Sequence, residues 1–257
     1  MLFTRAIVRP PSRTFAAGLT TVDLGQPDYA TALKQHESYC EALRSCGLSL
    51  THLPSDDQYP DSTFVEDTAI LTERCAVLTL PGAETRRGEV KSIQSELEKA
   101  YSVVRSISEP GTVDGGDICE AGDHFFIGIS ARTNEEGARQ LSEILAAYDY
   151  TSEFVDVRNV SSILHLKSGL SYLGNNQLVV IDELASCEQF SGYELIRVDG
   201  SEQYAANCVL INDSVLVAAG HPLFADALHL RGFRPIALEM SEFQKMDGGL
   251  SCLSLRF

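Results

Sequence analysis

Residues 245–257 read KMDGGLSCLSLRF, and this stretch indicates how the rest of the chain is arranged. Two glycines, Gly248 and Gly249, stand ahead of Cys252, which opens a short apolar run. Glycine next to a strand marks a place where the backbone closely approaches another part of the protein. A thiol that follows such a pair is therefore expected at a crowded, central position.

The composition is that of an ordinary globular protein and limits the possible partners. The 257 residues are 44% hydrophobic and 22% charged, and no Pro/Ser-rich linker divides them, so we expect residues 1–257 to form a single domain. The net charge is −16, from 36 acidic and 20 basic residues. This balance argues against nucleic acid as a partner, because binding phosphates needs a basic surface, and it mildly favours a cationic ligand.

The cysteines and the apolar runs indicate the compartment. The seven cysteines are an odd number, with no C-x-x-C pair and no histidine spacing typical of zinc. The opening MLFTRAIVRP is too short and too broken by charge for a secretory signal. No apolar run approaches the roughly 18 residues that a membrane span needs. We therefore expect a cytoplasmic protein with reduced thiols.

Helical and strand patterns alternate along the chain. Residues 28–47, 86–101 and 133–148 have helical periodicity, and the last of these opens with Thr133 and Glu136, the pattern of a capping box. Between the helices lie four strand pairs with turn signals, which cover residues 69–80, 117–129, 170–181 and 208–219.

Each strand pair begins at or just after a polar residue, and these residues recur about every 40 to 50 positions. They are Glu66 and Asp67, Asp114 and Asp117, His165, and Asn207, with Cys252 as a fifth member. A period of this size indicates a propeller or another closed array, in which the first strand of each unit lies at the central axis. The polar residues should then converge, and residues 2–8 should complete the unit that Cys252 begins.

The residues predicted to converge suit nucleophilic catalysis. A thiol needs a lowered pKa or a neighbouring base, an imidazole can protonate a leaving group and activate water, and a carboxylate can orient the imidazole. Cys252, His165 and Asp114 fit these three roles.

The other acids indicate what the thiol attacks. Asp61, Glu66 and Asp67 lie within one short segment and would repel each other unless a cation lay among them. A guanidinium pairs with carboxylates in fork geometry, so an acidic pocket facing a thiol points to attack on a guanidine carbon. Two modules also share a Gly-to-Arg spacing that ends in Arg86 and Arg132.

Each of these residues has a plainer interpretation when taken alone. A cysteine in a strand is usually a small core residue, and His165 between two leucines is by default a core histidine. The acids and arginines are of the kind that usually reaches solvent. Their recurrence at one place in a periodic module is what favours the catalytic interpretation.

Eight motifs in the chain resemble those of the guanidino-group-modifying (pentein) superfamily, most closely the bacterial dimethylarginine dimethylaminohydrolase family. They are GLTTVDLGQPDYA (18–30), PDSTFVEDTAI (60–70), LPGAETRRGE (80–89), PGTVDGGDI (110–118), ISARTNEEGARQ (129–140), LHLKSGLSYL (164–173), YAANCVLIN (204–212) and DGGLSCLSLRF (247–257). The resemblance implies an α/β-propeller of five ββαβ modules around a pseudo-fivefold axis.

The resemblance also implies roles for individual residues. Cys252 matches the nucleophile that forms a covalent S-alkylthiouronium intermediate, His165 matches the general acid and base, and Asp114 matches the acidic partner of the histidine. The implied substrate-binding residues are Leu19 in a lid loop, Asp61, Glu66 and Asp67 around the guanidinium and amino ends, Arg86 and Arg132 at the α-carboxylate, and Met246 through its backbone.

By this resemblance the chain hydrolyses Nω-methylated arginines to citrulline plus an alkylamine, without a metal or an organic cofactor. The expected partner is a small cationic guanidino compound, and a homodimer is possible. Two alternatives stay open at the level of sequence. One is an arginine deiminase-like or amidinotransferase-like enzyme acting on another guanidine. The other is a non-catalytic pentein binding protein related to the ribosome anti-association factors.

Overall fold

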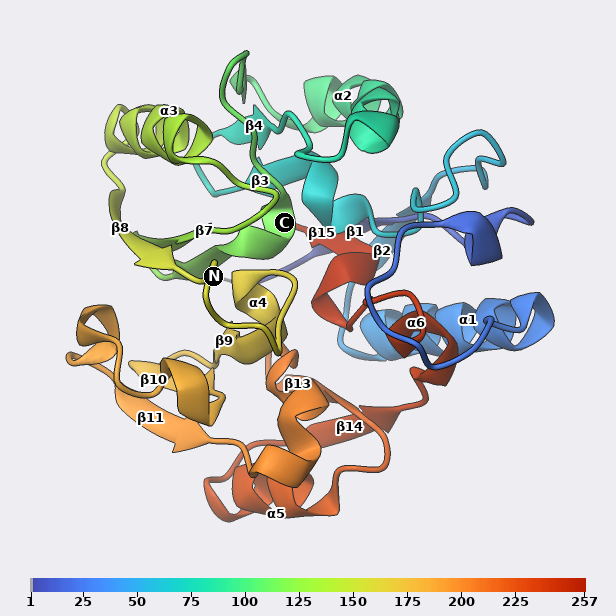
Figure 1. Ribbon diagram of the computed structural model, residues 1–257, viewed down its shortest axis with the longest axis vertical. Helices are drawn as coiled ribbons and strands as arrows, with labels where there is room; N and C mark the ends of the chain where they lie inside the picture. The colour runs from blue at the N-terminus through green and yellow to red at the C-terminus, as the bar shows by residue number, and fades with distance from the viewer. Residues whose placement is uncertain (1) are drawn as a thin grey trace.

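The computed structural model of the protein describes residues 2–257, which form five three-stranded sheets around a central axis (Figure 1). In every sheet the first strand of the module pairs antiparallel with the middle strand, and the middle strand pairs parallel with the third. Helices α1, α2, α3 and α5 lie at the periphery (Figure 1). The predicted five-module α/β-propeller is confirmed.

The first two modules have the complete ββαβ order. The first consists of β3 (Ala69–Leu71), β4 (Ala76–Leu78), α2 (Val90–Ala100) and β5 (Val104–Ser106). The second consists of β6 (Ile118–Ala121), β7 (His124–Ile129), α3 (Glu135–Ala146) and β8 (Thr151–Asp156).

The third module connects its last two strands differently. It comprises β9 (Leu170–Tyr172), β10 (Gln177–Val180), two short 3₁₀ helices η5 (Asp182–Leu184) and η6 (Glu188–Phe190), and β11 (Glu194–Arg197). Residues 181–193, which connect the last two strands, form these two short 3₁₀ helices in place of an α-helix. The fourth module returns to the full pattern, with β12 (Val209–Ile211), β13 (Ser214–Ala218), α5 (Pro222–Leu230) and β14 (Pro235–Leu238).

The fifth module joins segments from opposite ends of the sequence. Its strands are β15 (Ser254–Arg256), β1 (Arg5–Val8) and β2 (Ser49–His52), with α1 (Tyr29–Ser45) between β1 and β2. Ile7 pairs with Leu255 in the antiparallel ladder, and red β15 lies beside blue β1 in Figure 1. The predicted closure of the ring by residues 2–8 is therefore confirmed.

A short helix precedes the first strand of every module. These helices are η2 (Val65–Thr68), η4 (Gly115–Asp117), α4 (Leu166–Gly169), η7 (Gly200–Ala206) and η8 (Ser251–Leu253). Cys252 lies in η8, so the prediction that it lies in a strand is wrong by one turn. The short helices hold the polar residues of all five modules at the ring's centre.

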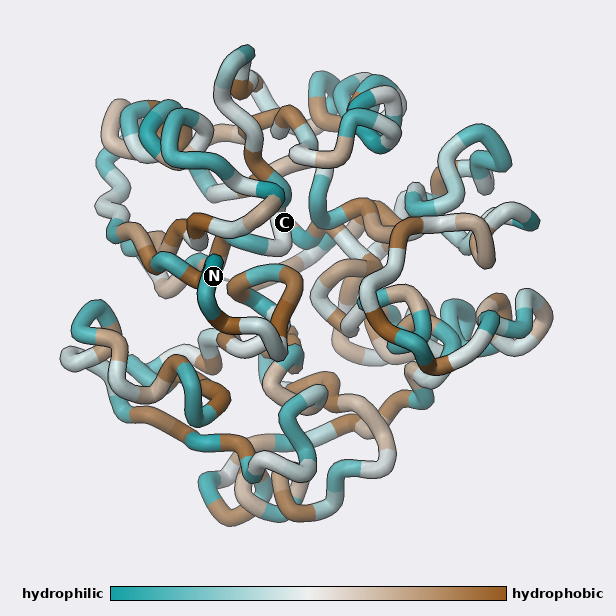
Figure 2. The backbone as a smooth tube through the Cα atoms, viewed as in Figure 1, coloured by the Kyte–Doolittle hydropathy of each residue, from teal (hydrophilic) through white to brown (hydrophobic). Residues whose placement is uncertain are grey.

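The outer helices bury one face each, which is why Figure 2 shows hydrophilic and hydrophobic residues along the same helix. In α3 the buried residues include Ala138 and Leu141. The predicted capping box of this helix is wrong, because Asn134 is the N-cap and its side chain accepts a hydrogen bond from Gly137 N over 2.7 Å. Thr133 instead accepts a hydrogen bond from the backbone of Asp114.

Three further short helices lie in connecting segments: η1 (Phe15–Ala17) precedes α1, η3 (Glu84–Glu89) precedes α2, and α6 (Ser241–Gln244) lies between the fourth and fifth modules. None of the helices within residues 2–257 combines the length and apolar character needed to span a bilayer. All seven cysteines are free thiols.

Candidate active site

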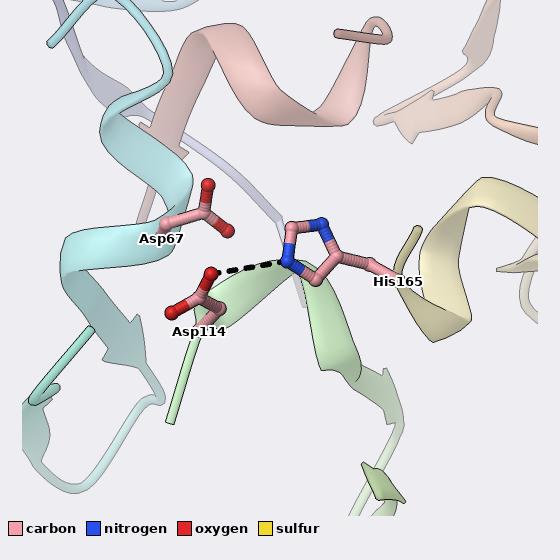
Figure 3. A group of neighbouring side chains, drawn as sticks. All are labelled: Asp67, Asp114 and His165. Carbon is pink, nitrogen blue, oxygen red and sulfur yellow. Dashed lines mark hydrogen bonds and ion pairs between the residues drawn. The ribbon is translucent and has the colours of Figure 1, made fainter. Parts of the chain in front are cut away.

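His165 and Asp114 form a buried hydrogen-bonded pair at the ends of two neighbouring short helices. Asp114 is the N-cap of η4 and His165 is the N-cap of α4. His165 Nε2 donates to Asp114 Oδ2 over 3.1 Å, and Asp114 Oδ1 accepts from Gly82 N over 2.8 Å. Figure 3 shows the imidazole pointing toward the carboxylates of Asp114 and Asp67. The pair that the sequence predicts is thus assembled from two modules.

The charges around His165 favour its protonated form. Burial lowers the pKa of the imidazole, but Asp117 and Asp67, together with Asp114, more than offset this and raise the pKa to about 9. Gly116 makes room for this packing, because a Cβ at this glycine would lie 2.8 Å from the His165 ring and 3.0 Å from Asp67 Oδ1. At neutral pH His165 therefore carries a proton that it can donate.

Asp67 is held by a buried chain of ion pairs. Its Oδ2 accepts from Arg86 Nη1 over 2.5 Å, and its Oδ1 accepts from Gly116 N over 2.8 Å. Arg86 also binds Glu89 in fork geometry, with Nε 3.1 Å and Nη2 2.8 Å from its two oxygens. Burial would raise the pKa of Asp67, but Arg86 and His165 lower it to about 2. Asp67 is therefore a fixed negative charge.

Glu66 lies in a second charged cluster behind Cys252. Its Oε1 is 2.6 Å from Lys167 Nζ and 3.3 Å from Arg256 Nη2. Its Oε2 accepts from Ser251 Oγ over 2.7 Å. One carboxylate here has two cationic partners and a hydroxyl donor, which explains how it is buried.

Cys252 is positioned by the glycines that precede it. A Cβ at Gly248 would overlap the ring of Phe64, and a Cβ at Gly249 would lie 2.5 Å from the Asn207 side chain. Gly249 N donates to Cys252 Sγ over 3.4 Å. Asn207 in turn accepts from Ser251 N over 2.9 Å, which ties η7 to η8. Close packing, as predicted, is the reason for the glycine pair.

The surroundings of Cys252 favour the protonated thiol. Burial raises the pKa of Cys252 to about 12, and the nearby carboxylates of Glu66 and Asp67 act in the same direction. Since Asp67 raises the pKa of His165 as well, one carboxylate acts on both the thiol and the imidazole. The resting pair is therefore a thiol and an imidazolium.

Asp61 lies beneath a loop of residues 18–27. Its carboxylate accepts from Leu19 N at 3.0 and 3.2 Å, while the Leu19 side chain is exposed. Thr20 Oγ1 donates to Lys245 O over 3.0 Å, which fixes the loop to the segment before Met246. The loop thus covers a buried acid through a backbone contact.

The two predicted arginines have different surroundings. Arg86 is buried and its guanidinium is occupied by Asp67, Glu89 and two backbone carbonyls. The guanidinium of Arg132 makes no hydrogen bond or ion pair to any residue of the described range 2–257. Burial raises the pKa of Asp61, and the charges of Arg86 and Arg132 only partly oppose this. Met246 is buried with its Cε near Gly18 and Asp61.

Several residues of the site were not predicted from the sequence. Lys167, Arg256 and Glu89 form ion pairs with predicted site residues, and Ser251 binds Asn207, which the module period did predict. One signal for them exists, since three buried carboxylates require nearby cations. The sequence does not say which of 20 basic residues supply them.

Donor atoms of Asp67, Asp114 and His165 lie within 4.8 Å of one another, a spacing that a metal ion can also use. His165 Nε2 already binds Asp114, and Asp67 already binds Arg86 and Gly116. We therefore interpret the group as a charged hydrogen-bond network. With a thiol beside it, the arrangement suits covalent attack on a cationic carbon, followed by proton donation from His165.

Comparisons with known proteins agree with this geometry. Residues 25–212 match the family model described as N,N dimethylarginine dimethylhydrolase, eukaryotic. The chain is 45% identical over 257 residues to the N(G),N(G)-dimethylarginine dimethylaminohydrolase of Pseudomonas aeruginosa, covering 100% of both chains.

Two solved structures of this enzyme type are similar to the chain over its full length. A cysteine-to-serine mutant from Pseudomonas aeruginosa, complexed with citrulline, has a TM-score of 0.97 and 44% identity and is covered to 100%, as is this chain. A histidine-to-glycine dimethylarginine dimethylaminohydrolase, as an adduct with S-methyl-L-thiocitrulline, has a TM-score of 0.96 and 45% identity with the same coverage. The chain therefore belongs to the dimethylarginine dimethylaminohydrolase family.

Proposed function

We propose that this protein hydrolyses Nω-methylated arginines, asymmetric dimethylarginine and monomethylarginine, to citrulline plus dimethylamine or methylamine. The observation that carries the proposal is the junction of three groups at the axis: the Cys252 thiol, the protonated His165–Asp114 pair and the fixed negative charge of Asp67. A guanidinium placed among these acids presents its central carbon to the sulfur.

Substrate binding supplies the missing activation of the thiol. Burial and the carboxylates hold Cys252 protonated, and a bound guanidinium brings a positive charge that favours the thiolate. The thiol proton leaves to solvent, and the thiolate forms a C–S bond to the guanidinium carbon. His165, already protonated, donates its proton to the substituted nitrogen as the C–N bond breaks and the amine departs.

The second half of the reaction uses the same histidine as a base. Neutral imidazole takes a proton from water while the oxygen bonds to the carbon of the S-alkylthiouronium intermediate. The C–S bond then breaks and the hydroxyl proton of the adduct passes to the departing sulfur, which restores the thiol and leaves the ureido group of citrulline. Asp114 stabilises each imidazolium form through its 3.1 Å hydrogen bond.

The amino-acid end of the substrate requires separate contacts. We assign its α-carboxylate to Arg132, whose guanidinium has no partner within residues 2–257, and to the one Nη1 hydrogen of Arg86 that its bond to Asp67 leaves over. Asp61 and the Met246 carbonyl are assigned to the α-amino group, under the loop that holds Leu19. We assign Glu66, which lies next to the Cys252 segment, to the guanidinium end of the substrate, where its negative charge stabilises the cation.

The enzyme is proposed to act in the cytoplasm, which its free thiols support, and to form a homodimer. Leu223 and Leu230 are two turns apart on α5 and both exposed, so they offer an apolar contact. Size-exclusion chromatography with light scattering distinguishes dimer from monomer for the wild type and for Leu230→Asp.

Citrulline formation from dimethylarginine, monomethylarginine, arginine and other guanidines tests the reaction. We expect turnover of the methylated arginines and a covalent adduct on the Cys252 peptide by mass spectrometry of the acid-quenched enzyme. Turnover of arginine alone would favour the deiminase alternative, and transfer to an added amine would favour the amidinotransferase alternative. An adduct on another cysteine, or full activity of Cys252→Ser, contradicts the assignment.

A further inference from the structure

A cavity of about 460 Å³ lies among the inner strands of the propeller and ends behind the nucleophile. Residues of β3, β6, β9, β12 and β15 line it, whereas Cys252, His165 and Asp114 do not. At its inner end stand Glu66, Lys167, Ser251 and Arg256. The cavity and the catalytic thiol are therefore separated by the Glu66 cluster.

We propose that Lys167, acting through its ion pair with Glu66 at the inner end of this cavity, is a positioning residue that sets how readily Cys252 becomes a thiolate. The inference rests on the proposed nucleophilic role of Cys252. It does not rest on turnover, since the reactivity of the free thiol can be measured by itself.

The geometry ties the cluster directly to the helix that carries the thiol. Glu66 accepts from Ser251, the residue before Cys252, over 2.7 Å, and Lys167 Nζ is 2.6 Å from the other oxygen of the same carboxylate. Because one carboxylate contacts both the η8 helix and the ammonium group, the position and charge of Glu66 are transmitted to the thiol.

The ionisable groups around Cys252 act in both directions. The carboxylates of Glu66 and Asp67 on η2 disfavour the thiolate, and Lys167 on α4 favours it. Burial raises the pKa of the Tyr204 hydroxyl on η7. A negative charge on Cys252 acts in the same direction, so Tyr204 lies close to the thiol. Other ionisable groups also face the cluster. They are Arg256 on β15, which also binds Glu66, Glu120 on β6, which lines the same cavity and interacts with Lys167 and Arg256, Tyr39 on α1 beside Arg256, and His165 at the start of α4.

The cavity lowers the cost of placing Glu66, Lys167 and Arg256 together inside the protein. Buried charges are costly unless they are paired, and here a single carboxylate is shared by two cations. The polar inner end borders a space large enough for solvent, so the excess positive charge need not be fully desolvated. The Lys167 ammonium, paired with Glu66, is therefore close enough to act on the charge of the thiol.

Alkylation of the folded, substrate-free enzyme by iodoacetamide tests the proposal. The rate at Cys252 is followed against pH by peptide mass spectrometry in the wild type, Lys167→Met, Lys167→Arg and Glu66→Gln. Cys46 and Cys187, which are half-buried, serve as internal standards in every sample. Lys99→Met, which breaks an exposed ion pair with Glu96, is the matched control.

We expect Lys167→Met to slow alkylation of Cys252 about threefold to tenfold at a fixed pH below its pKa, because tenfold corresponds to one pKa unit. Lys167→Arg and Lys99→Met should match the wild type, and Glu66→Gln should accelerate the reaction. Cys46 and Cys187 should react equally in all variants.

Unchanged alkylation in Lys167→Met overturns the proposal, as does equal slowing in Lys167→Arg, which would indicate a steric effect. Should Lys167→Met fail to fold, Glu66→Gln decides alone: acceleration supports the proposal, and an unchanged or slower rate overturns it. A normal Cys252 profile with no citrulline formation would instead contradict the proposed function while leaving this inference intact.

Discussion

The proton on His165 determines which step of the reaction the resting enzyme is prepared for. An imidazole with a pKa near 9 is a ready acid and becomes a base only after it has donated its proton. The Cys252 thiol, with a pKa of about 12, needs a nearby positive charge before it can lose its proton at neutral pH. The site is therefore arranged for the arrival of a charged substrate.

Replacing Asp114 by Asn should reduce turnover about a hundredfold and move the alkaline limb of kcat to lower pH. The sign follows from the charge, because losing a carboxylate 3.1 Å from Nε2 destabilises the imidazolium and lowers its pKa. The measurement is kcat against pH, with Asp123→Asn, in a surface ion pair with Arg74, as the control. A limb that moves upward would contradict this role.

Substitutions of Arg132 and Arg86 should affect different properties, substrate binding for Arg132 and stability for Arg86. Arg132→Met should raise KM about tenfold or more with an unchanged Tm, because its guanidinium has no partner within the described chain. Enzyme kinetics and thermal unfolding of the single variant test this expectation. An unchanged KM would remove Arg132 from the substrate site.

Arg86→Met should instead lower the free energy of unfolding by about 3 to 5 kcal/mol, because Asp67 and Glu89 would be left as buried, unpaired carboxylates. Urea denaturation measures the loss. Arg87→Met, which breaks the neighbouring surface pair with Glu109, should change little. Similar losses in the two variants would contradict the buried role of Arg86.

At the scale of elements, the glycine pair before η8 lets three modules meet. Gly248→Ala should destabilise the protein by about 1 to 3 kcal/mol, because the added methyl overlaps the Phe64 ring. Gly192→Ala, where an added Cβ meets nothing within 4 Å, is the matched control. Chemical denaturation of the two variants compares them, and equal stability would refute the close-packing explanation.

The sequence predicts the elements well where a pattern is local and less well where a tertiary contact intervenes. Hairpin alternation located the strand pairs around β3, β6, β9 and β12, and periodicity located α1, α2 and α3. The capping box failed because Thr133 is used by Asp114, which leaves Asn134 to cap α3. The one-turn helix η8 carries no pattern long enough to detect.

The same limit explains the site. Period and residue type indicated Cys252, His165 and Asp114, since each opens a module. Lys167 and Arg256 were not found because a basic residue near a module start is common, and only the folded ring brings both onto Glu66. Partners contributed across modules require the three-dimensional closure.

At the scale of the molecule, the β1–β15 ladder makes the ring one cooperative unit. Leu255→Asp places a charge in the buried contact opposite Ile7 and should cost at least about 3 kcal/mol of stability. Leu2→Asp, at an exposed leucine outside the ladder, should be nearly neutral. Thermal unfolding and citrulline formation should fall together in Leu255→Asp alone, and parallel losses in both variants would contradict this view.

The pairing of β1 with β15 also determines when the fifth sheet can form during synthesis. On the ribosome β1 is made before its antiparallel partner β15, and the ladder between them has the greatest sequence separation of any within residues 2–257. A nascent chain that contains the first four modules already holds Asp67, Asp114 and His165 but lacks Cys252. Ring closure and the arrival of Cys252 therefore depend on the same segment, and a chain made only as far as the fourth module cannot display this nucleophile.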